Sequence, residues 1–227
     1  MAVHSGRIVW EDHRAGNGDI YMLGLSTMTE TPVCVESHGQ YAPSIYGNLI
    51  AWQDMRNGNS DIYARDMASG VTFPVCTNTN DQFNPNVSER YIAWFDLRNA
   101  TKDVYGYDLK TGKEIVICNQ AGDQGAPEIS GSFVVWTDWR NGDCDLYGKD
   151  LAGGPEMVIA QGLADQINPE IDGKVIVWQD HRLGDLNTDI WMTCIPGQSP
   201  TADLNGDCRV DFEDLAILAE QWMMTAY

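Results

Sequence analysis

The segment IAWQDMRNGNSDIY, residues 50–63, occurs five times in related form along this chain. The tryptophans near the start of the copies lie 42 residues apart, at Trp10, Trp52, Trp94, Trp136 and Trp178. A repeat of this length whose units read as short strands is typical of a β-propeller blade. The repeat therefore predicts an all-β fold: a five-bladed β-propeller of four-stranded antiparallel blades.

The second copy shows how one unit is read as four strands. Pro43 stands at the start of a first strand, and residues 49–53 form a second. Asn and Gly at 57–59 accept the positive φ angles of a hairpin turn. Residues 61–66 and 73–76 complete the unit as a third and a short fourth strand. No segment before residue 211 shows helical spacing of apolar groups, which excludes a helical solenoid.

The two ends of the repeat array are expected to be irregular. Val3 falls in register with Ile45, so the chain begins inside the first strand of the first blade. Cys194 closes the third strand of the fifth blade, and no counterpart of a fourth strand follows. We expect a chain that is trimmed, closes imperfectly, or covers its open edge with a partner, and self-association is one way to cover it.

Side chains that recur in every blade are interpreted as structural. The repeated tryptophans are expected to pack between blades. Each Asp two residues after the tryptophan is expected to pair with the Arg two residues later, and with the Asp across the hairpin, as in Asp54, Arg56 and Asp61. Cys34, Cys76 and Cys118 share one register position with Ala160, so they are read as small buried apolar groups.

Composition narrows the function classes. With 33 acidic and 14 basic residues, the net charge is −19. Nucleic acids and anionic membrane surfaces require cationic faces, so neither is an expected partner. No apolar run approaches membrane-spanning length, which argues against membrane insertion. The residues at the start carry no signal peptide, so the sequence leaves the native start open.

The repeat pattern ends near residue 195, and the segment after it has a different composition. Residues 1–195 form the predicted propeller, 196–202 a linker, and 203–227 a calcium-binding loop and helix. Oxygen ligands recur at the spacing that wraps a hard cation in an EF-hand-like loop. The predicted calcium ligands are Asp203, Asn205, Asp207, the Arg209 carbonyl, Asp211 and Asp214. Cys208 stands where such loops usually place glycine, and Cys194 and Cys208 are a possible disulfide pair.

Two family resemblances follow from these motifs. The segment DLNGDCRVDFEDLAIL, residues 203–218, resembles one half of a dockerin, which implies calcium binding and docking onto a cohesin-like partner. The repeats in 1–195 resemble TolB-like, WD-repeat-like blades through the patterns P-x-[IV], [IV]-[AV]-W-x-D-x-R and D-[ILV]-[YW]. The resemblance to such blades of bacterial exported proteins implies a secreted or cell-surface protein that binds a protein or a saccharide.

Ligand-binding residues are sought where the blades differ. The residue three after each tryptophan is variable, and it singles out Trp139, His13 and His181. Trp139 is the best aromatic contact, and the two histidines would be neighbours if the first and fifth blades met.

These observations favour a non-enzymatic, extracellular, calcium-binding recognition or scaffold protein. Its propeller would bind a protein or polysaccharide, and its C-terminal module would aid attachment or assembly. Two alternatives stay open: a multivalent carbohydrate-binding lectin, and a five-bladed glycoside hydrolase. The hydrolase needs distinct, unrepeated carboxylates, whereas most prominent carboxylates of this chain are repeated from blade to blade.

Overall fold

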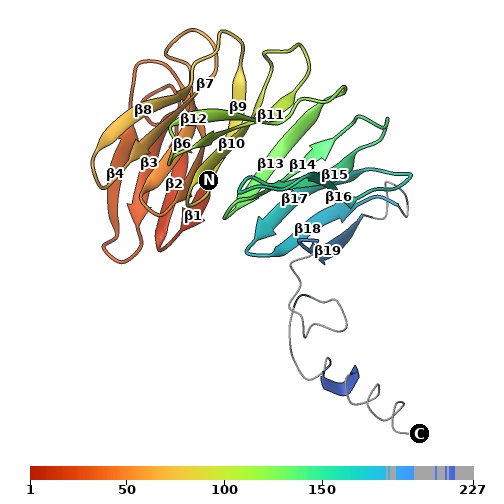
Figure 1. Cartoon of the computed structure of the whole chain (residues 1–227). Coiled ribbons are helices and arrows are strands. Elements are labelled where there is room, and N and C mark those ends of the chain that lie inside the picture. The colour runs from red at the N-terminus through yellow and green to blue at the C-terminus, as the bar shows by residue number, and fades with distance from the viewer. Residues whose placement is uncertain (183, 185–187, 197–207, 209–212, 214, 218–227) are drawn as a thin grey trace, which may run out of the picture.

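The structure, a computed structural model, describes residues 1–182, 184, 188–196, 208, 213 and 215–217. Its strands form five antiparallel sheets arranged one after another along the chain (Figure 1). Sheets 1 to 4 have four strands each, and within the described residues sheet 5 has three. The repeat therefore folds as predicted, as consecutive propeller-like blades.

The strands follow the chain order within every sheet. Sheet 1 comprises β1 (Ala2–His4), β2 (Arg7–Asp12), β3 (Asp19–Gly24) and β4 (Thr29–Cys34). Sheet 2 comprises β5 (Gln40–Tyr46), β6 (Leu49–Asp54), β7 (Asp61–Asp66) and β8 (Val71–Cys76). Sheet 3 comprises β9 (Gln82–Val87), β10 (Tyr91–Asp96), β11 (Asp103–Asp108) and β12 (Lys113–Cys118). Sheet 4 comprises β13 (Gln124–Ser130), β14 (Phe133–Asp138), β15 (Asp145–Asp150) and β16 (Glu156–Ala160). Sheet 5 comprises β17 (Gln166–Asp172), β18 (Val175–Asp180) and β19 (Asp189–Cys194).

The hydrophobic core is divided among the gaps between sheets. Four buried clusters join sheets 1 and 2, 2 and 3, 3 and 4, and 4 and 5. Trp52, Trp94 and Trp136 have no exposed surface, and Trp178 is 5% exposed, so the predicted packing of the indoles between blades is confirmed for these four. Each blade therefore covers one face of the next.

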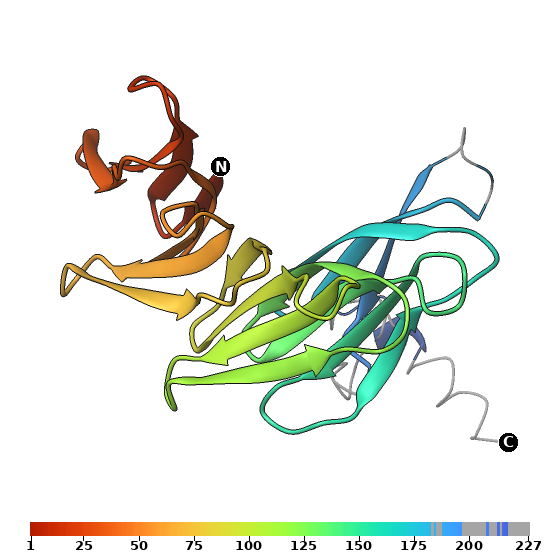
Figure 2. The ribbon, with the colours of Figure 1, turned by 90° about the horizontal axis from the view of Figure 1, so that it is seen from above.

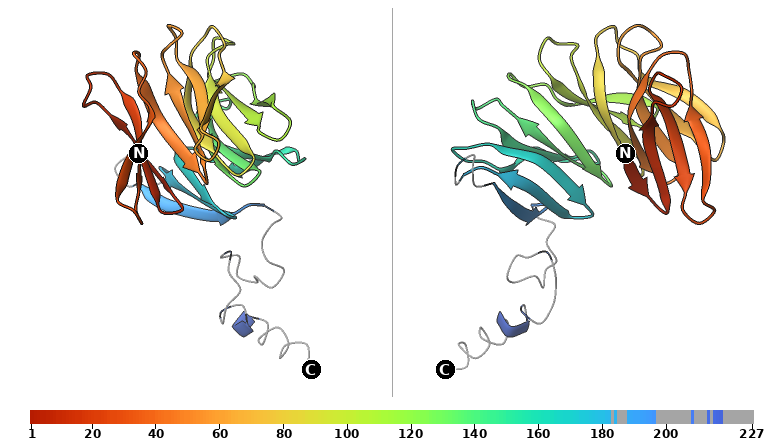
Figure 3. Two further views of the ribbon diagram at one scale, coloured as in Figure 1. Left: turned by 90° about the vertical axis from the view of Figure 1, so that its left-hand side faces the viewer. Right: turned by 180° about the vertical axis from the view of Figure 1, so that it is seen from behind.

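The arc formed by the sheets is open. None of the four buried clusters joins sheet 5 to sheet 1, and the two end sheets stand apart when the arc is seen from above (Figure 2) and from behind (Figure 3, right). Sheet 1 consequently leaves Val3 exposed and Trp10 half-buried, and sheet 5 leaves Ile190 71% exposed. The five described sheets thus form an open arc, and no core connects the two end sheets within the described residues.

An Arg–Asp clamp fixes the hairpin of each blade, as predicted. In sheet 3, Arg98 Nε and Nη2 donate to the two carboxylate oxygens of Asp96 at 2.9 and 2.6 Å. Trp94 Nε1 donates to the same carboxylate at 3.1 Å, and the guanidinium lies 4.0 Å from the Tyr105 ring centre. Asp96 is fully buried, so these donors replace the water that its charge has lost.

The Asp across the hairpin takes a different partner from the one predicted. Asn99 Nδ2 donates to Asp103 at 2.6 Å, and in sheet 2 Asn57 and Asn59 donate to Asp61 at 2.6 and 3.0 Å. In sheet 3, the Arg98 guanidinium instead lies over the Tyr105 ring and donates to Glu114 of the outermost strand. The turn asparagines, which are closer in sequence, satisfy the second carboxylate.

The repeated thiols are buried, as expected. Burial raises the pKa of Cys34 to about 11 and the pKa values of Cys76 and Cys118 to about 12. They therefore stay protonated near neutral pH and are poor nucleophiles. Each also accepts a hydrogen bond from the arginine of the next clamp, at 3.1–3.4 Å.

At the C-terminal end, Cys194 is bonded to Cys208 in a disulfide. Glu213 and residues 215–217 are helical. The rest of the predicted loop and helix lies outside the described residues. Within the part of the chain that is described, no helix has the length and apolar character needed to cross a membrane.

Candidate functional site

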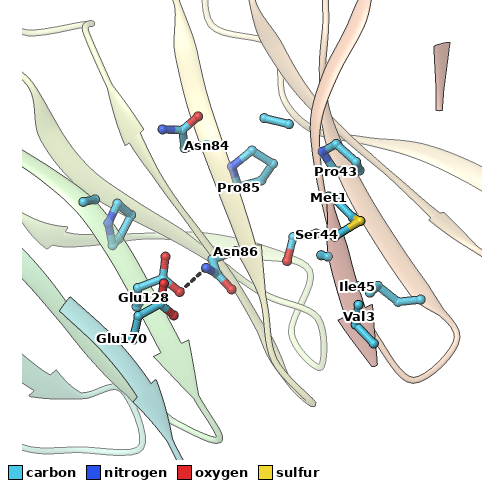
Figure 4. A pocket seen from close by; sticks show the side chains of 14 residues that line it. Met1, Val3, Pro43, Ser44, Ile45, Asn84, Pro85, Asn86, Glu128 and Glu170 are labelled. Carbon is cyan, nitrogen blue, oxygen red and sulfur yellow. Dashed lines mark hydrogen bonds between the residues drawn. The ribbon is translucent and has the colours of Figure 1, made fainter. Parts of the chain in front are cut away.

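The innermost strands of the arc surround a pocket of about 480 Å³ (Figure 4). Its wall is built from the same segment of each repeat, contributed by β1, β5, β9, β13 and β17. In the four later sheets, this is the segment that contains the P-x-[IV] pattern. The residues that line it on those four sheets are Ala42–Ile45, Asn84–Asn86, Ala126–Glu128 and Glu170.

A backbone bulge shapes the wall segments of sheets 2 to 5. The residue before each proline has a positive φ, 47° at Ala42, 49° at Asn84, 44° at Ala126 and 51° at Asn168. The pairing register of the inner strand shifts at the same place in all four sheets. Bulges re-aim side chains, and positive φ at residues other than glycine is a strained conformation that often occurs at functional sites.

The residue that follows each proline is where the repeat changes. Ser44, Asn86, Glu128 and Glu170 occupy one register position, 42 residues apart, and all four line the pocket. Two blades therefore contribute neutral polar groups and two contribute carboxylates. The pocket is chemically asymmetric although the backbone that forms it is repeated.

Glu128 is the most perturbed acid of this pocket. Burial, and then the charge of Glu170, raise its pKa to about 8, against the hydrogen bond that it accepts from Asn86 Nδ2. Figure 4 shows the Glu128 and Glu170 side chains side by side, with Asn86 directed at Glu128. A carboxyl group of this kind is half-protonated near pH 8 and gains from a positive charge brought close to it.

Trp139 belongs to a neighbouring pocket of about 270 Å³. Phe95, Lys102, Ile167 and Asn168 also line it, and Ala126 lines both this pocket and the central one. Trp139 is 40% exposed, so part of its ring is free to contact a ligand. Of the three ligand residues predicted from sequence, Trp139 is the one placed beside the central pocket.

The two predicted histidines are not brought together. His13 lies at the end of sheet 1, where its Nε2 is 2.6 Å from Glu11 and its ring centre is 6.5 Å from that of Tyr41. His181 follows β18 of sheet 5 and is half-buried. Because no core joins sheets 1 and 5, the condition for their contact is not met.

The predicted calcium ligands Asp203, Asn205, Asp207, Arg209, Asp211 and Asp214 lie outside the described residues. Cys208, the loop position where glycine is usual, is described and has a φ of 70°. Within the described ranges, no three His, Cys, Asp or Glu side chains are grouped as a metal site requires.

Sequence reasoning missed the position of Ser44, Asn86, Glu128 and Glu170. It sought variation after the tryptophan, whereas the strongest variation of charge lies after the proline. The sequence does contain a signal for this position. A residue that changes from Ser to Asn to Glu within an otherwise regular repeat is more typical of a binding site than of the structural framework.

The comparisons with known proteins bear on the fold. No protein-family model and no curated protein matches the sequence. TolB from Acinetobacter baumannii is similar in structure, with a TM-score of 0.64 and 19% identity over 84% of this chain and 51% of the TolB chain. The chain thus spans about half the length of that protein.

Two further solved structures are similar. An oligogalacturonate lyase in complex with manganese has a TM-score of 0.65 and 14% identity, over 83% of this chain and 59% of the lyase. A chain of a nidogen/laminin complex has a TM-score of 0.56 and 14% identity, over 78% of this chain and 68% of its own. At these identities the likeness establishes a TolB-like β-propeller fold and nothing finer.

Proposed function

We propose that this chain is a non-enzymatic recognition module that binds a partner protein in the pocket at the centre of the arc. The observation that carries the proposal is the register position of Ser44, Asn86, Glu128 and Glu170. It is the place where a repeated scaffold presents unrepeated polar groups to an open pocket. Rigid strands position these groups, as a recognition site requires.

The chemistry of the pocket favours a cationic group of the partner. Glu128 and Glu170 supply the negative charge, and Asn86 and Ser44 supply neutral oxygen acceptors. A lysine or arginine entering the pocket would favour the ionised form of Glu128. The pocket beside it, with Trp139, Phe95 and Ile167, suits an adjacent apolar side chain.

Charge and fold support this reading. The net charge of −19 draws cationic partners by long-range attraction. Propellers of similar structure include TolB and a chain of a complex between two proteins, nidogen and laminin. By contrast, Trp52, Trp94 and Trp136 are fully buried, so a lectin with one sugar-stacking tryptophan per blade finds no support in them.

Selection from a random peptide library displayed on phage tests this function. Peptides selected on the wild-type chain are expected to carry a lysine or arginine next to an aromatic or aliphatic residue. Binding of these peptides should weaken by about tenfold or more in the double variant Glu128→Gln, Glu170→Gln, because the basic residue loses both carboxylates of the pocket, one of them half-buried.

The matched control is Glu89→Gln, which changes an exposed acid outside the central pocket. It should leave peptide affinity within about threefold of wild type, since a change at an exposed rim charge is worth little. Selected peptides without basic residues, or equal binding to the double variant, would contradict the proposal.

One observation favours a second candidate, cleavage of a glycosidic bond. Glu128 and Glu170 are an unrepeated carboxylate pair, and a raised pKa of one of them suits a general acid. The same variants separate the two functions. In a hydrolase, Glu128→Gln and Glu170→Gln would each abolish release of reducing ends from a polysaccharide, and the wild-type chain would show that release.

The remaining parts of the proposal concern location and calcium. We place the protein outside the cytoplasm, at the cell surface or secreted, and the Cys194–Cys208 disulfide suits an oxidising compartment. We further propose that residues 203–214 bind calcium and that this module, like the half-dockerin it resembles, aids attachment, with a cohesin-like protein as its partner.

Isothermal titration of the full chain with calcium is expected to reveal one binding site. Asp207→Ala should remove the heat of binding, because a hard cation needs the full set of oxygen ligands in its loop. Asp143→Ala, in the turn of the fourth repeat, is the control that should leave it intact. A wild-type chain that binds no calcium would remove this part of the proposal.

A further inference from the structure

The clamp arginines of sheets 1 to 4 differ in whether a glutamate of the outermost strand accepts a hydrogen bond from their Nη1 group. In sheets 1, 3 and 4, the Nη1 group of the clamp arginine donates to a glutamate of the outermost strand. The three pairs are Arg14–Glu30 at 2.5 Å, Arg98–Glu114 at 2.6 Å and Arg140–Glu156 at 2.5 Å. In sheet 2, the equivalent residue is Thr72, and Arg56 has no such carboxylate.

The place of the missing carboxylate is a pocket. It has a volume of about 270 Å³ and lies between β4 of sheet 1 and strands β7 and β8 of sheet 2. Arg56 and Thr72 line it, and Arg65 brings a second guanidinium into it. Glu36 is the single carboxylate of its lining, and Pro32 and Val35 give it an apolar wall.

Arg56 and Arg65 each keep an N–H donor that makes no hydrogen bond within the described residues. Asp54 takes Nε and Nη2 of Arg56 at 2.8 and 2.7 Å, and Nη2 also contacts Cys34, which leaves Nη1 without a partner in the described chain. Arg65 Nη1 donates to Thr72 at 3.1 Å, whereas its buried Nε has no hydrogen-bond partner in the same described residues. A buried donor without a partner is costly and calls for an acceptor.

From this geometry we propose that the pocket formed by Arg56, Arg65 and Thr72 is a second binding site, which takes a ligand carboxylate attached to a short apolar group. The ligand carboxylate stands where Glu30, Glu114 and Glu156 stand in the other sheets. Three pairs within the same chain thus show that a carboxylate fits beside Nη1 of this arginine. The apolar wall receives the group that bears the carboxylate, and the site is separate from the acidic central pocket.

Titration of the isotope-labelled chain with sodium butyrate, followed by the NMR signals of the arginine side chains, tests the site. Saturable shifts at Arg56 and Arg65 are expected, with none from sodium chloride or butylammonium at equal concentration. Thr72→Glu, which restores the residue of the other sheets, should weaken binding by at least about tenfold, since it places a carboxylate of the protein itself in the site.

Val71→Glu is the matched control, because it adds the same charge to the neighbouring residue of β8, which is exposed and lies outside the pocket lining, and it should retain butyrate binding within about threefold. Arg65→Leu, which copies Leu23 of sheet 1, should weaken binding by about tenfold or more. A capped Val-Glu-Val peptide used as a second probe separates the two sources of the carboxylate. Tighter binding than butyrate assigns the site to an acidic protein side chain, and weaker binding assigns it to a small free acid.

Three results would overturn the proposal. The first is the absence of saturable shifts in the wild-type chain. The second is equal butyrate affinity of wild type and Thr72→Glu, with the latter shown to be folded by its circular dichroism spectrum. The third is equally strong binding of sulfate and butyrate with no effect of Arg65→Leu, which would mean an adventitious ion only.

Discussion

Replacing Trp94 by alanine is expected to lower the free energy of unfolding by about 3–5 kcal/mol. The Trp94 side chain is fully buried in the cluster between sheets 2 and 3, where it packs with Ala64, Val75 and Cys76. Its ring nitrogen also donates to Asp96, so truncation leaves both a cavity and a buried carboxylate that has lost one donor. Urea unfolding followed by circular dichroism measures the effect.

Trp10 is the matched control, because it occupies the same register position in sheet 1. No sheet in the described part of the chain covers its outer face, and it is half-buried against Tyr21, with ring centres 6.2 Å apart. Trp10→Ala is therefore expected to cost less than half as much as Trp94→Ala. Equal costs in dilute, monomeric protein would contradict an open arc and favour a ring in which Trp10 is covered.

The same pair of variants examines self-association. Among the residues that the structure describes, sheets 1 and 5 each leave one apolar face uncovered, with Val3 and Trp10 at one end and Ile190 and Met192 at the other. Within the arc, the equivalent faces of neighbouring sheets pack on one another in each of the four buried clusters. If copies of the chain associate end to end, the cost of Trp10→Ala will rise with protein concentration while that of Trp94→Ala stays constant.

Stability is expected to fall as pH rises from about 4.5 to about 8. The pKa of Glu128 is raised from 4.5 in the unfolded chain to about 8 in the folded one, so the folded state binds the extra proton between these values. Because the unfolded state binds fewer protons there, the free energy of unfolding decreases with pH. The contribution is present below pH 4.5 and is lost above about pH 8, and its size is at most about 5 kcal/mol.

Variants of the two glutamates check the assignment. The glutamine of Glu128→Gln cannot ionise, so the free energy of unfolding of this variant should no longer decrease between pH 5 and 8 on account of this residue. Glu170→Gln removes the neighbouring charge that helps to raise the pKa of Glu128, so the fall should move to lower pH. Urea midpoints measured from pH 4.5 to 9 give the comparison. A wild-type profile that is flat over this range would contradict a half-buried Glu128 that stays protonated up to about pH 8.

Much of the fold could be predicted because it depends on local, repeated patterns. The three strands described in the fifth sheet follow from the repeat up to Cys194. The burial of Trp52 and the Arg56–Asp54 clamp follow from spacing along a strand, since residues two apart share a face. The predicted partner of Asp61 was wrong. Two asparagines of the turn donate to Asp61 instead, and the spacing of residues along a strand does not reveal contacts made within a turn.

The candidate sites depended on contacts between sheets. Glu128 and Glu170 are 42 residues apart in sequence, and only the curvature of the arc and the bulges before the prolines bring them to one pocket. The unpaired donors of Arg56 and Arg65 likewise become visible only when β4 of sheet 1 closes over sheet 2. Burial and the charges of neighbouring sheets set a pKa, and these are properties of the assembled molecule.

By itself the sequence determined the blade: the strand order, the turns, the indole that packs outward from each sheet and the clamp that holds each hairpin. These depend on interactions within about 42 residues, and five copies specify them five times. The tertiary structure alone decided that carboxylates of two sheets meet in a pocket at the centre of the arc, and that one clamp keeps free donors. The physical reason is that packing angles between sheets and the loss of water around charged groups are set by the neighbouring sheets, which no single repeat contains.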